Sequence, residues 1–452
     1  MNRIMVSVSF LVPVLVSALV LAETTPQDLA SALTPVRERF EAPAVSAAVV
    51  RDGQVIGQGV SGVRGASEKT PVAIGDRTLI GSCGKSLTRL LIARLVDQGK
   101  LRFDSTLAEL LPDVAMRDEY KSVTIEDVMS FKGGIQPYTR ITPQDTPIMF
   151  NLEGKPREQR AQFIAHVLNE TPVAAPRTKW VYSNAAYSLL GHLAERVADR
   201  PFEELLRDEV FKPIGMDSAV VGAPFADTNI PGWYGHQRTP EGFKQVARSR
   251  GRMPAMAPAG LMSCSIGDFA KMGAALVAIE SGKPLIFLSP EVAKRLPELR
   301  PGDDEEGVPF FGGDGQYTAV FALWPSKNVA IIAQTNAGDS DDVCRALVEA
   351  ARAAVAPDVP AFAPMITAGK GKYGLRIQTV DDDDDQWEIA SVEPDSIGAQ
   401  AGLKSGDRIT AIDGKPLADL APRQRLEALK KSPVTIALER DAKEMSVTLQ
   451  TP

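Results

Sequence analysis

Ser82 and Lys85 stand three residues apart at the start of the segment Ser82–Gly99, which reads SCGKSLTRLLIARLVDQG. A serine hydroxyl is a poor nucleophile until a neighbouring group accepts its proton. Residues three apart on a helix share one face, so the Lys85 amine can reach the Ser82 oxygen. The N–H groups at a helix start also attract an oxyanion that forms there. The S-x-x-K spacing therefore predicts a nucleophile and its base.

A simpler interpretation makes Ser82 a helix N-cap and Lys85 a solvated charge. Two observations favour the catalytic interpretation. Ser82 is the only serine in the chain that is followed by lysine at the third position. The helix that it begins is also too apolar for a surface helix, so we expect it to be mostly buried.

Tyr182 and Asn184 form a second candidate pair, in the stretch KWVYSNAAYSLLGHLAERV. A tyrosine hydroxyl held between Lys85 and Ser82 could have its pKa lowered by the cation, and could then act first as base and later as acid. The Asn184 amide could position Lys85 and the substrate. The alternative is a loop tyrosine that precedes a helix capped by Asn184.

The composition narrows the classes of function. The chain has 452 residues, of which 44% are hydrophobic and 24% charged, and this length allows two or three domains. Its net charge of −7 argues against a nucleic-acid partner. The few histidines and cysteines lack the spacing of metal ligands, so we expect no metal, no cofactor and free thiols; these residues are His166, His192, His236, Cys83, Cys264 and Cys344.

The first 22 residues read as a secretory signal peptide. Arg3 supplies the charged region, Ile4–Leu19 the apolar region, and Val20–Ala22 a cleavage pattern of small residues. An uncleaved anchor is the alternative. No other stretch is apolar enough to span a membrane. We therefore expect the mature chain to have no membrane span and to be exported to the periplasm or secreted.

The order of expected elements suggests one sheet built from both ends of a domain. Strands are expected near its beginning and near its end, with helices and long loops from Leu101 to about Leu299 between them. The expected elements are a helix at Asp28–Phe40, strands at Ala44–Val50, Gln54–Val60, Phe310–Pro325 and Asn328–Asn336, and a final helix capped by Ser340. Such an order predicts a sheet completed by distant segments, with an inserted helical region.

Beyond this domain, Ala353–Lys372 is rich in alanine, proline and glycine and reads as a semi-extended linker. A small β-rich unit follows it. The acidic run Asp381–Asp385 lacks EF-hand spacing, so we expect a solvated hairpin loop there and no calcium site.

Together, Ser82-x-x-Lys85 and Tyr182-x-Asn184 resemble the serine β-lactamase and penicillin-binding superfamily, and most closely class C β-lactamases, D-alanyl-D-alanine carboxypeptidases and related esterases. The resemblance covers roughly Ala44–Ala354 and includes the text around the motifs: IGSCGKSLTRLLIARLVDQGKL, VTIEDVMSFKGGI, WVYSNAAYSLLGHLAERV and APAGLMSCSIGDFAKM. It implies an α/β fold with an antiparallel sheet flanked by helices, an adjoining helical domain and a site in the cleft.

The third motif of the superfamily, Lys-Thr-Gly or His-x-Gly on a strand that lines the cleft, is altered here. The corresponding stretch reads Phe311-Gly312-Gly313-Asp314. In this register the Asp314 N–H joins the Ser82 N–H as oxyanion hole. The esterase branch often carries an aromatic residue and two glycines at this place, and Phe311 offers apolar contact only. The resemblance therefore favours uncharged esters as substrates. The usual histidine before the glycine turn is also replaced, by Phe131-Lys132.

The C-terminal unit resembles a bacterial PDZ domain over Lys372–Leu449. Val392–Gly414, VEPDSIGAQAGLKSGDRITAIDG, is close to the signature of that family, with a tight turn expected at Asp413-Gly414. Such domains bind the C-terminus of a peptide partner along a sheet edge. The residues that correspond to the carboxylate-binding loop and the following strand are Tyr373, Gly374, Leu375, Arg376 and Ile377. A module that only packs against its neighbour is the alternative.

The sequence thus predicts a signal peptide at 1–22, a β-lactamase-like domain at 23–355, a linker at 356–371 and a PDZ domain at 372–452. The leading hypothesis is an exported serine hydrolase that forms an acyl-enzyme with an ester, a β-lactam or a D-Ala-type amide. The substrate would be a small molecule or a peptide. Two alternatives remain: a penicillin-recognising protein with little or no turnover, and a scaffold whose function resides in the PDZ domain.

Overall fold

The computed structural model describes residues 25–225, 230–239, 242–247, 253–298, 307, 309–361, 373–380, 383–392, 396–420, 425, 428–429, 431–441 and 443–451. The predicted signal peptide and most of the predicted linker lie outside these residues.

One mostly antiparallel sheet joins the beginning and the end of the larger domain. Its strand order is β1-β3-β2-β11-β10-β9, and only the β1–β3 pair is parallel. The early strand β2 pairs along its length with the late strand β11, from Arg51 opposite Val329 to Val45 opposite Thr335. The expected sheet of distant segments is therefore confirmed. Its strands are β1 (Gln27–Asp28), β2 (Ala44–Arg51), β3 (Gln54–Gly62), β9 (Pro309–Gly313), β10 (Thr318–Trp324) and β11 (Val329–Thr335).

Helices cover both faces of this sheet. Side chains alternate along β2, so Val45, Ala47 and Val49 pack in one core with α1 (Ala30–Arg39) and α13 (Asp341–Val355), while Ala48 and Val50 pack in another. The second core also contains residues of α2 (Lys85–Asp97) and α11 (Ile266–Glu280). Ser340 precedes α13 but its side chain makes no capping hydrogen bond, contrary to expectation.

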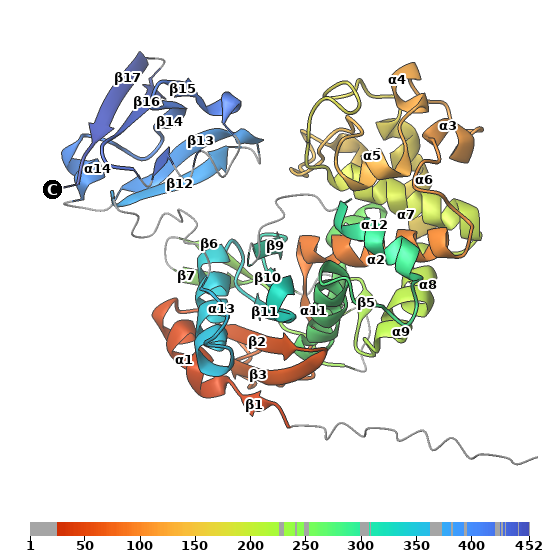
Figure 1. Cartoon of the computed structure of the whole chain (residues 1–452), viewed down its shortest axis with the longest axis horizontal. Coiled ribbons are helices and arrows are strands. Elements are labelled where there is room, and N and C mark those ends of the chain that lie inside the picture. Colours follow the sequence, from red (N-terminus) through yellow and green to blue (C-terminus); the bar gives the residue numbers. More distant parts are fainter. Residues whose placement is uncertain are drawn as a thin grey trace, which may run out of the picture.

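A helical region stands beside the sheet, with α2 between them (Figure 1). It consists of α3 (Leu107–Leu110), α4 (Asp118–Lys121), α5 (Ile125–Met129), η2 (Pro147–Phe150), α6 (Pro156–Val167), α7 (Asn184–Ala198) and α8 (Phe202–Leu206). The remaining helical segments of the domain are η1 (Gly81–Gly84), η3 (Arg207–Phe211), α9 (Lys212–Ile214), η4 (Pro254–Met256), α10 (Ala257–Gly260), α12 (Pro290–Glu298) and η5 (Pro325–Lys327).

Short strands also occur where the sequence predicted only helices and loops. β4 (Thr78–Leu79), β8 (Met262–Cys264) and β5 (Val220–Val221) form a three-stranded sheet, and β6 (His236–Thr239) and β7 (Gly242–Gln245) form a hairpin. Strands of two to four residues are too short to produce a readable alternation of polar and apolar side chains, which explains why they were missed.

The helical region contains a buried ion pair. Arg160 of α6 donates two hydrogen bonds to Glu195 of α7, at 2.8 and 3.0 Å, and both side chains are fully buried. Arg160 also donates to Glu203, and the Phe202 N–H donates to Glu195. The pair therefore joins α6, α7 and the start of α8.

We expect Glu195→Ala to lower the free energy of unfolding by about 3–5 kcal/mol, because the buried guanidinium loses its main counter-charge. The measurement is urea unfolding of the domain, followed by circular dichroism. Asp113→Ala is the matched control, because it breaks the exposed Arg196–Asp113 pair and should cost about 0–1 kcal/mol. Equal losses in the two variants would contradict the prediction.

The C-terminal unit has its own sheet and its own core. Its strand order is β12-β13-β14-β16-β17, with β15 paired to β14. The predicted tight turn is confirmed, since Asp413 and Gly414 both have positive φ values and link β14 to β15. The elements are β12 (Leu375–Val380), β13 (Asp383–Val392), α14 (Ile397–Gln400), β14 (Arg408–Ile412), β15 (Lys415–Pro416), η6 (Leu417–Asp419), β16 (Val434–Arg440) and β17 (Lys443–Leu449).

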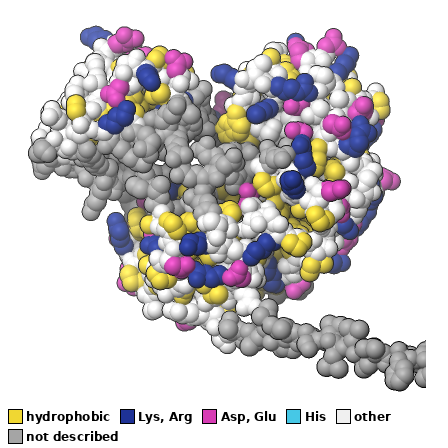
Figure 2. Space-filling view, in the orientation of Figure 1, with side chains coloured by type: hydrophobic (Ala, Val, Ile, Leu, Met, Phe, Trp, Pro, Cys, Tyr) yellow, Lys and Arg dark blue, Asp and Glu magenta, His cyan; other side chains and the backbone are white. Residues whose placement is uncertain are grey.

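The surface carries both signs of charge. On the face shown in Figure 2, lysines and arginines are interspersed with aspartates and glutamates, without a continuous basic area. Among the described residues, no helix combines the length and the apolar character that crossing a bilayer requires.

Candidate active site

Ser82 lies in the single turn η1, directly before α2. Its side chain caps neither η1 nor α2, so the N-cap interpretation is wrong. The backbone of η1 packs against β9 without intervening side chains. A Cβ atom on Gly81 would lie 2.2 Å from the Gly313 nitrogen, and one on Gly312 would lie 2.7 Å from the Ser82 nitrogen. Glycine is therefore required at both contacts.

Lys85 is buried beneath Ser82, with only 1% of its surface exposed. Its Nζ donates to Ser82 Oγ at 3.0 Å, to Asn184 Oδ1 at 2.7 Å and to the Ala259 carbonyl at 2.6 Å. The interpretation as a solvated charge is therefore wrong. These three acceptors match the three N–H groups of an ammonium, and all three are uncharged.

Burial without a carboxylate partner governs the ionisation of Lys85. Desolvation disfavours the ammonium and lowers the pKa of Lys85 to about 7. A substantial fraction of the amine is therefore neutral near pH 7. Neutral Nζ donates only two hydrogen bonds, and its lone pair can accept the proton of the Ser82 hydroxyl at 3.0 Å.

Tyr182 approaches Ser82 from the other side. Its Oη donates to Ser82 Oγ at 2.7 Å, and the centre of its ring lies 4.8 Å from Lys85 Nζ. Helix α7 follows directly, but its N-cap is Ser183, whose Oγ accepts from the Ala186 N–H. The alternative of a helix capped by Asn184 is therefore wrong. The structure brings the hydroxyls of Ser82 and Tyr182 and the amine of Lys85 into one hydrogen-bonded group.

Asn184, the first residue of α7, orients this group. Its Oδ1 accepts from Lys85, while its Nδ2 donates to the Tyr138 carbonyl at 3.0 Å. Its backbone N–H donates to the Pro137 carbonyl. The amide is thus held at both ends, which fixes the oxygen toward the lysine.

The segment Ala257–Gly260, α10, also contributes to the site, although no role was predicted for it. The Ala259 carbonyl binds Lys85, and the Pro258 carbonyl accepts from Thr88 Oγ1 at 2.7 Å. Gly260 has a φ of +151°, and a Cβ there would lie 2.9 Å from the Ser82 nitrogen. Because every residue has a carbonyl group, the sequence cannot single out the one that binds Lys85. Gly260 was the only sign in the sequence that this segment approaches another backbone closely.

The predicted role of Phe311 is wrong, because its ring lies on the other side of the sheet. The Phe311 ring packs against the core beneath α13, with its centre 4.7 Å from the Arg345 guanidinium carbon. The residues of β9 on the opposite face to Phe311 are Phe310 and Gly312. Gly312 contacts η1, and the Phe310 ring packs against the Phe321 ring, with their centres 5.3 Å apart. The true register is shifted by one residue.

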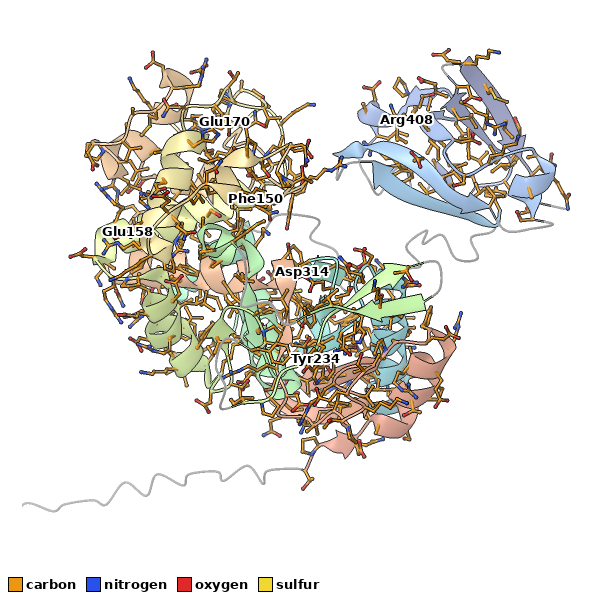
Figure 3. All side chains as sticks on the ribbon, turned by 180° about the vertical axis from the view of Figure 1, so that it is seen from behind. Phe150, Glu158, Glu170, Tyr234, Asp314 and Arg408 are labelled. Carbon is orange, nitrogen blue, oxygen red and sulfur yellow. The ribbon has the colours of Figure 1, made fainter. Side chains whose placement is uncertain are left out.

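The same shift affects the predicted oxyanion hole. The β9 nitrogen that lies against η1 is that of Gly313, not that of Asp314. The Asp314 side chain instead accepts the N–H groups of Gln316 and Tyr317 and closes the turn to β10. Figure 3 labels Asp314 at this end of the sheet region, on the side toward the helical region.

The three cysteines and His192, the other candidate nucleophiles and bases, are buried. Cys83 is fully buried, and desolvation raises the pKa of its thiol far above the usual range. Cys264 and Cys344 are likewise buried and free. His192 is buried in α7, where desolvation lowers its pKa to about 4. Within the described part of the chain, no group of histidine, cysteine or carboxylate side chains could hold a metal ion.

The residues expected to bind a peptide lie at and before β12. Tyr373 and Leu375 are buried, and the Tyr373 hydroxyl donates to the Lys431 carbonyl. Gly374, with a φ of +67°, turns the chain into β12, which continues through Arg376 and Ile377. In the described part of the sheet, β12 pairs with β13 alone, so its other edge is available for a further strand.

Comparisons with known proteins agree with this geometry. The beta-lactamase family matches residues 29–355, and the PDZ domain family matches residues 364–439. The beta-lactamase of Pseudomonas fluorescens is 25% identical over 201 residues, 44% of this chain and 51% of that protein. The chain thus spans about half the length of this curated relative.

Two solved structures share the fold. The octameric penicillin-binding protein homologue from Pyrococcus abyssi has a TM-score of 0.62 at 17% identity, covering 92% of this chain and 94% of that one. The hydrolase EstCE1, described as having promiscuous acyltransferase activity, has a TM-score of 0.58 at 16% identity, covering 72% and 98%.

Proposed function

The chain belongs to the beta-lactamase family over residues 29–355, with a PDZ domain toward its C-terminus, and from this premise we propose that it is a serine hydrolase that forms an acyl-enzyme at Ser82. The observation that carries the proposal is the position of Ser82 Oγ. It lies 3.0 Å from Lys85 Nζ and 2.7 Å from Tyr182 Oη. A nucleophile in contact with both a base and a second proton carrier is the arrangement that acyl transfer requires.

In the acylation step, neutral Lys85 accepts the Ser82 proton while Oγ forms a bond to the substrate carbonyl carbon. The electron pair of the carbonyl bond moves to its oxygen. When the tetrahedral intermediate collapses, that pair returns and the bond to the leaving group breaks. Tyr182 donates its proton to the leaving group and regains one from the Lys85 ammonium, so the site returns to its starting protonation state.

The oxyanion of this intermediate would be bound by backbone N–H groups. The proposed donors are those of Ser82 and Gly313, which lie where η1 and β9 pack together. Gly313 replaces Asp314 in this role because of the corrected register. In deacylation, water takes the place of the leaving group, and Tyr182 and Lys85 accept its proton as its oxygen bonds to the acyl carbon. When this second intermediate collapses, the bond to Ser82 Oγ breaks and the same proton returns to Oγ, which releases the acid and restores the site.

Strand β9, which lies beside the site, indicates which substrates are preferred. Residues Pro309–Gly313 of β9 include no cation, and Phe310 is the aromatic residue on the same face as Gly312. We therefore expect uncharged acyl groups to be preferred over carboxylate-bearing ones, with Phe310 in the role first assigned to Phe311.

A substrate panel tests the proposal. It comprises a short-chain p-nitrophenyl ester, nitrocefin as β-lactam and a D-Ala-D-Ala peptide, each assayed with the wild-type chain. We expect turnover of the ester with a higher kcat/KM than for the other two. A burst of acylation followed by no turnover would support a penicillin-recognising protein instead. No reaction with any of the three would contradict the proposal.

The ionisation of Lys85 gives a prediction for pH dependence. Because the ammonium cannot accept the Ser82 proton, and the pKa of Lys85 is lowered to about 7, activity should fall as the pH drops below 7. The measurement is kcat/KM for an uncharged ester between pH 5.5 and 9, where the substrate itself does not titrate. A flat profile would contradict the assignment of Lys85 as base.

We also propose that the chain is exported and that its PDZ domain recruits peptides or protein partners. The supports are the apolar N-terminal stretch with its cleavage pattern, and the open edge of β12 beside the Tyr373–Gly374 turn. Export can be tested by mass spectrometry of the mature N-terminus, which should begin after Ala22.

Ending the chain after Ala361 should leave a folded hydrolase domain with unchanged turnover of small esters. The expectation rests on the two separate cores, since the C-terminal unit packs around its own residues Trp387, Ile389 and Ile436. The comparison is kcat/KM of residues 23–361 against the full chain, with peptide binding measured in parallel. A truncated domain that aggregates or loses ester turnover would show that the PDZ unit completes the core or the site.

A further inference from the structure

Phe131 occupies a backbone position that normally belongs to glycine. It follows α5 and its C-cap Ser130, with a φ of +59°. The Phe131 N–H donates to the Val128 carbonyl, and the Lys132 N–H donates to the Asp127 carbonyl, which is the Schellman pattern. A bulky residue in the left-handed region costs roughly 1–2 kcal/mol of conformational energy. A large side chain at this place therefore needs a reason beyond ending the helix.

The Phe131 ring lies among the aromatic rings of the site. Its centre is 4.9 Å from that of Tyr182 and 5.2 Å from that of Tyr187, and the side chain is only 2% exposed. The Phe131 carbonyl accepts the Val181 N–H at 2.9 Å, so both its side chain and its backbone hold the segment that carries Tyr182.

The two tyrosine rings in turn enclose the Lys85 amine. Nζ lies 4.8 Å from the centre of the Tyr182 ring and 5.6 Å from that of Tyr187. We propose that Phe131 is a positioning residue, which holds the rings of Tyr182 and Tyr187 against Lys85 and keeps water away from its amine. Phe131 itself touches neither Ser82 nor the reacting atoms in this role.

In the described part of the chain, the titratable groups near the Lys85 amine are Cys83, Tyr182 and Tyr187. Cys83 of η1 and Tyr187 of α7 remain neutral near pH 7, because burial raises the pKa of the Cys83 thiol far beyond that range and raises the pKa of Tyr187 to about 12. Arg89 of α2 lies near Tyr187 and lowers the pKa of that tyrosine slightly against the effect of burial. Tyr182 hydrogen-bonds to Ser82, and Asn184 and the Ala259 carbonyl are uncharged. In this proposal, Phe131 therefore controls the access of water to the Lys85 amine.

The effect of Phe131 on the rate of hydrolysis rests on the proposed function, whereas its effect on the pKa of Lys85 does not. Replacing the ring by Leu or Met should admit water to Lys85, weaken the desolvation that lowers its pKa, and raise that pKa. The acidic limb of kcat/KM for an uncharged ester should then move up by about 0.5–1 pH unit. At pH 7 the neutral fraction of Lys85, and with it kcat/KM, should fall about two- to sixfold.

A direct titration decides the question without any substrate. The full chain labelled with [ε-13C]lysine is titrated by NMR, and the Lys85 resonance is identified by its absence in Lys85→Met. We expect a midpoint near 7 in the wild type and a higher midpoint in both Phe131→Leu and Phe131→Met. The matched control is Phe269→Leu, an equally buried phenylalanine of α11, which should destabilise the chain without moving the midpoint.

Midpoints that coincide in the wild type and in both folded Phe131 variants would overturn the proposal. A shift of equal size in Phe269→Leu would also overturn it, because loosened packing anywhere would then suffice. If instead the wild type shows no turnover that depends on Ser82, the proposed function fails, while the NMR titration still decides the role of Phe131.

Discussion

Ser82→Ala should abolish both covalent labelling and turnover. Removing the nucleophile of a serine hydrolase lowers kcat by about 10³–10⁶-fold, because no other group can form the acyl-enzyme. The neighbouring thiol of Cys83 cannot substitute, since it is buried and its pKa is raised far above the usual range. The measurements are the mass of a fluorophosphonate adduct on the digested protein and kcat/KM for a short-chain ester.

Ser86→Ala is the matched control for this experiment. Ser86 lies four residues after Ser82, in the first turn of α2, with 7% of its surface exposed, so the substitution makes the same chemical change close by in the chain. We expect this variant to be labelled and active. An adduct on the Cys83 side chain, or equal labelling of Ser82→Ala, would refute Ser82 as the nucleophile.

Lys85→Met should lower kcat/KM by about 10²–10⁴-fold, the range that general-base catalysis contributes. Methionine fills a similar volume but cannot accept the Ser82 proton. The substitution should also remove the acidic limb near pH 7, because the group that titrates there is gone. The rate of acylation, measured before product release becomes limiting, reports the effect most directly.

Lys100→Met is the control for charge, since Lys100 is exposed in the turn after α2. It should leave both the rate and the pH profile unchanged. A Lys85→Met variant that keeps the limb near pH 7 would assign that ionisation to another group, with Tyr182 the first candidate. Retention of more than about a tenth of the activity would contradict the role of Lys85 as base.

Much of the site could be predicted because its residues follow local rules. Ser82 and Lys85 are one helical turn apart, and Tyr182 and Asn184 flank the N-cap of α7, so their spacing indicates their proximity. The paired strands β2 and β11 could be predicted from their apolar β-branched runs. These features depend on a few consecutive residues, which a sequence displays directly.

The third motif could not be placed because two registers fit the sequence FFGGD equally well. A strand shifted by one residue presents the opposite face, so the choice between Phe310 and Phe311 depends on packing that only the fold defines. The role of Ala259 was hidden for a different reason, since its contact to Lys85 is made by a backbone carbonyl. The short strands β4, β5 and β8 depend on one another for pairing.

The pairing of β2 with β11 also determines when the protein can become active. The Ala44 N–H donates to Asn336 Oδ1, a contact between residues 292 positions apart in the chain. Contacts of such high sequence separation form late and slow folding, because a long loop must close first. A nascent chain that already carries the Ser82 helix still lacks the β9 backbone at Gly313. Reactivity at Ser82 should therefore appear only after residues beyond β11 have left the ribosome, and labelling of stalled nascent chains of increasing length with a fluorophosphonate would detect that onset.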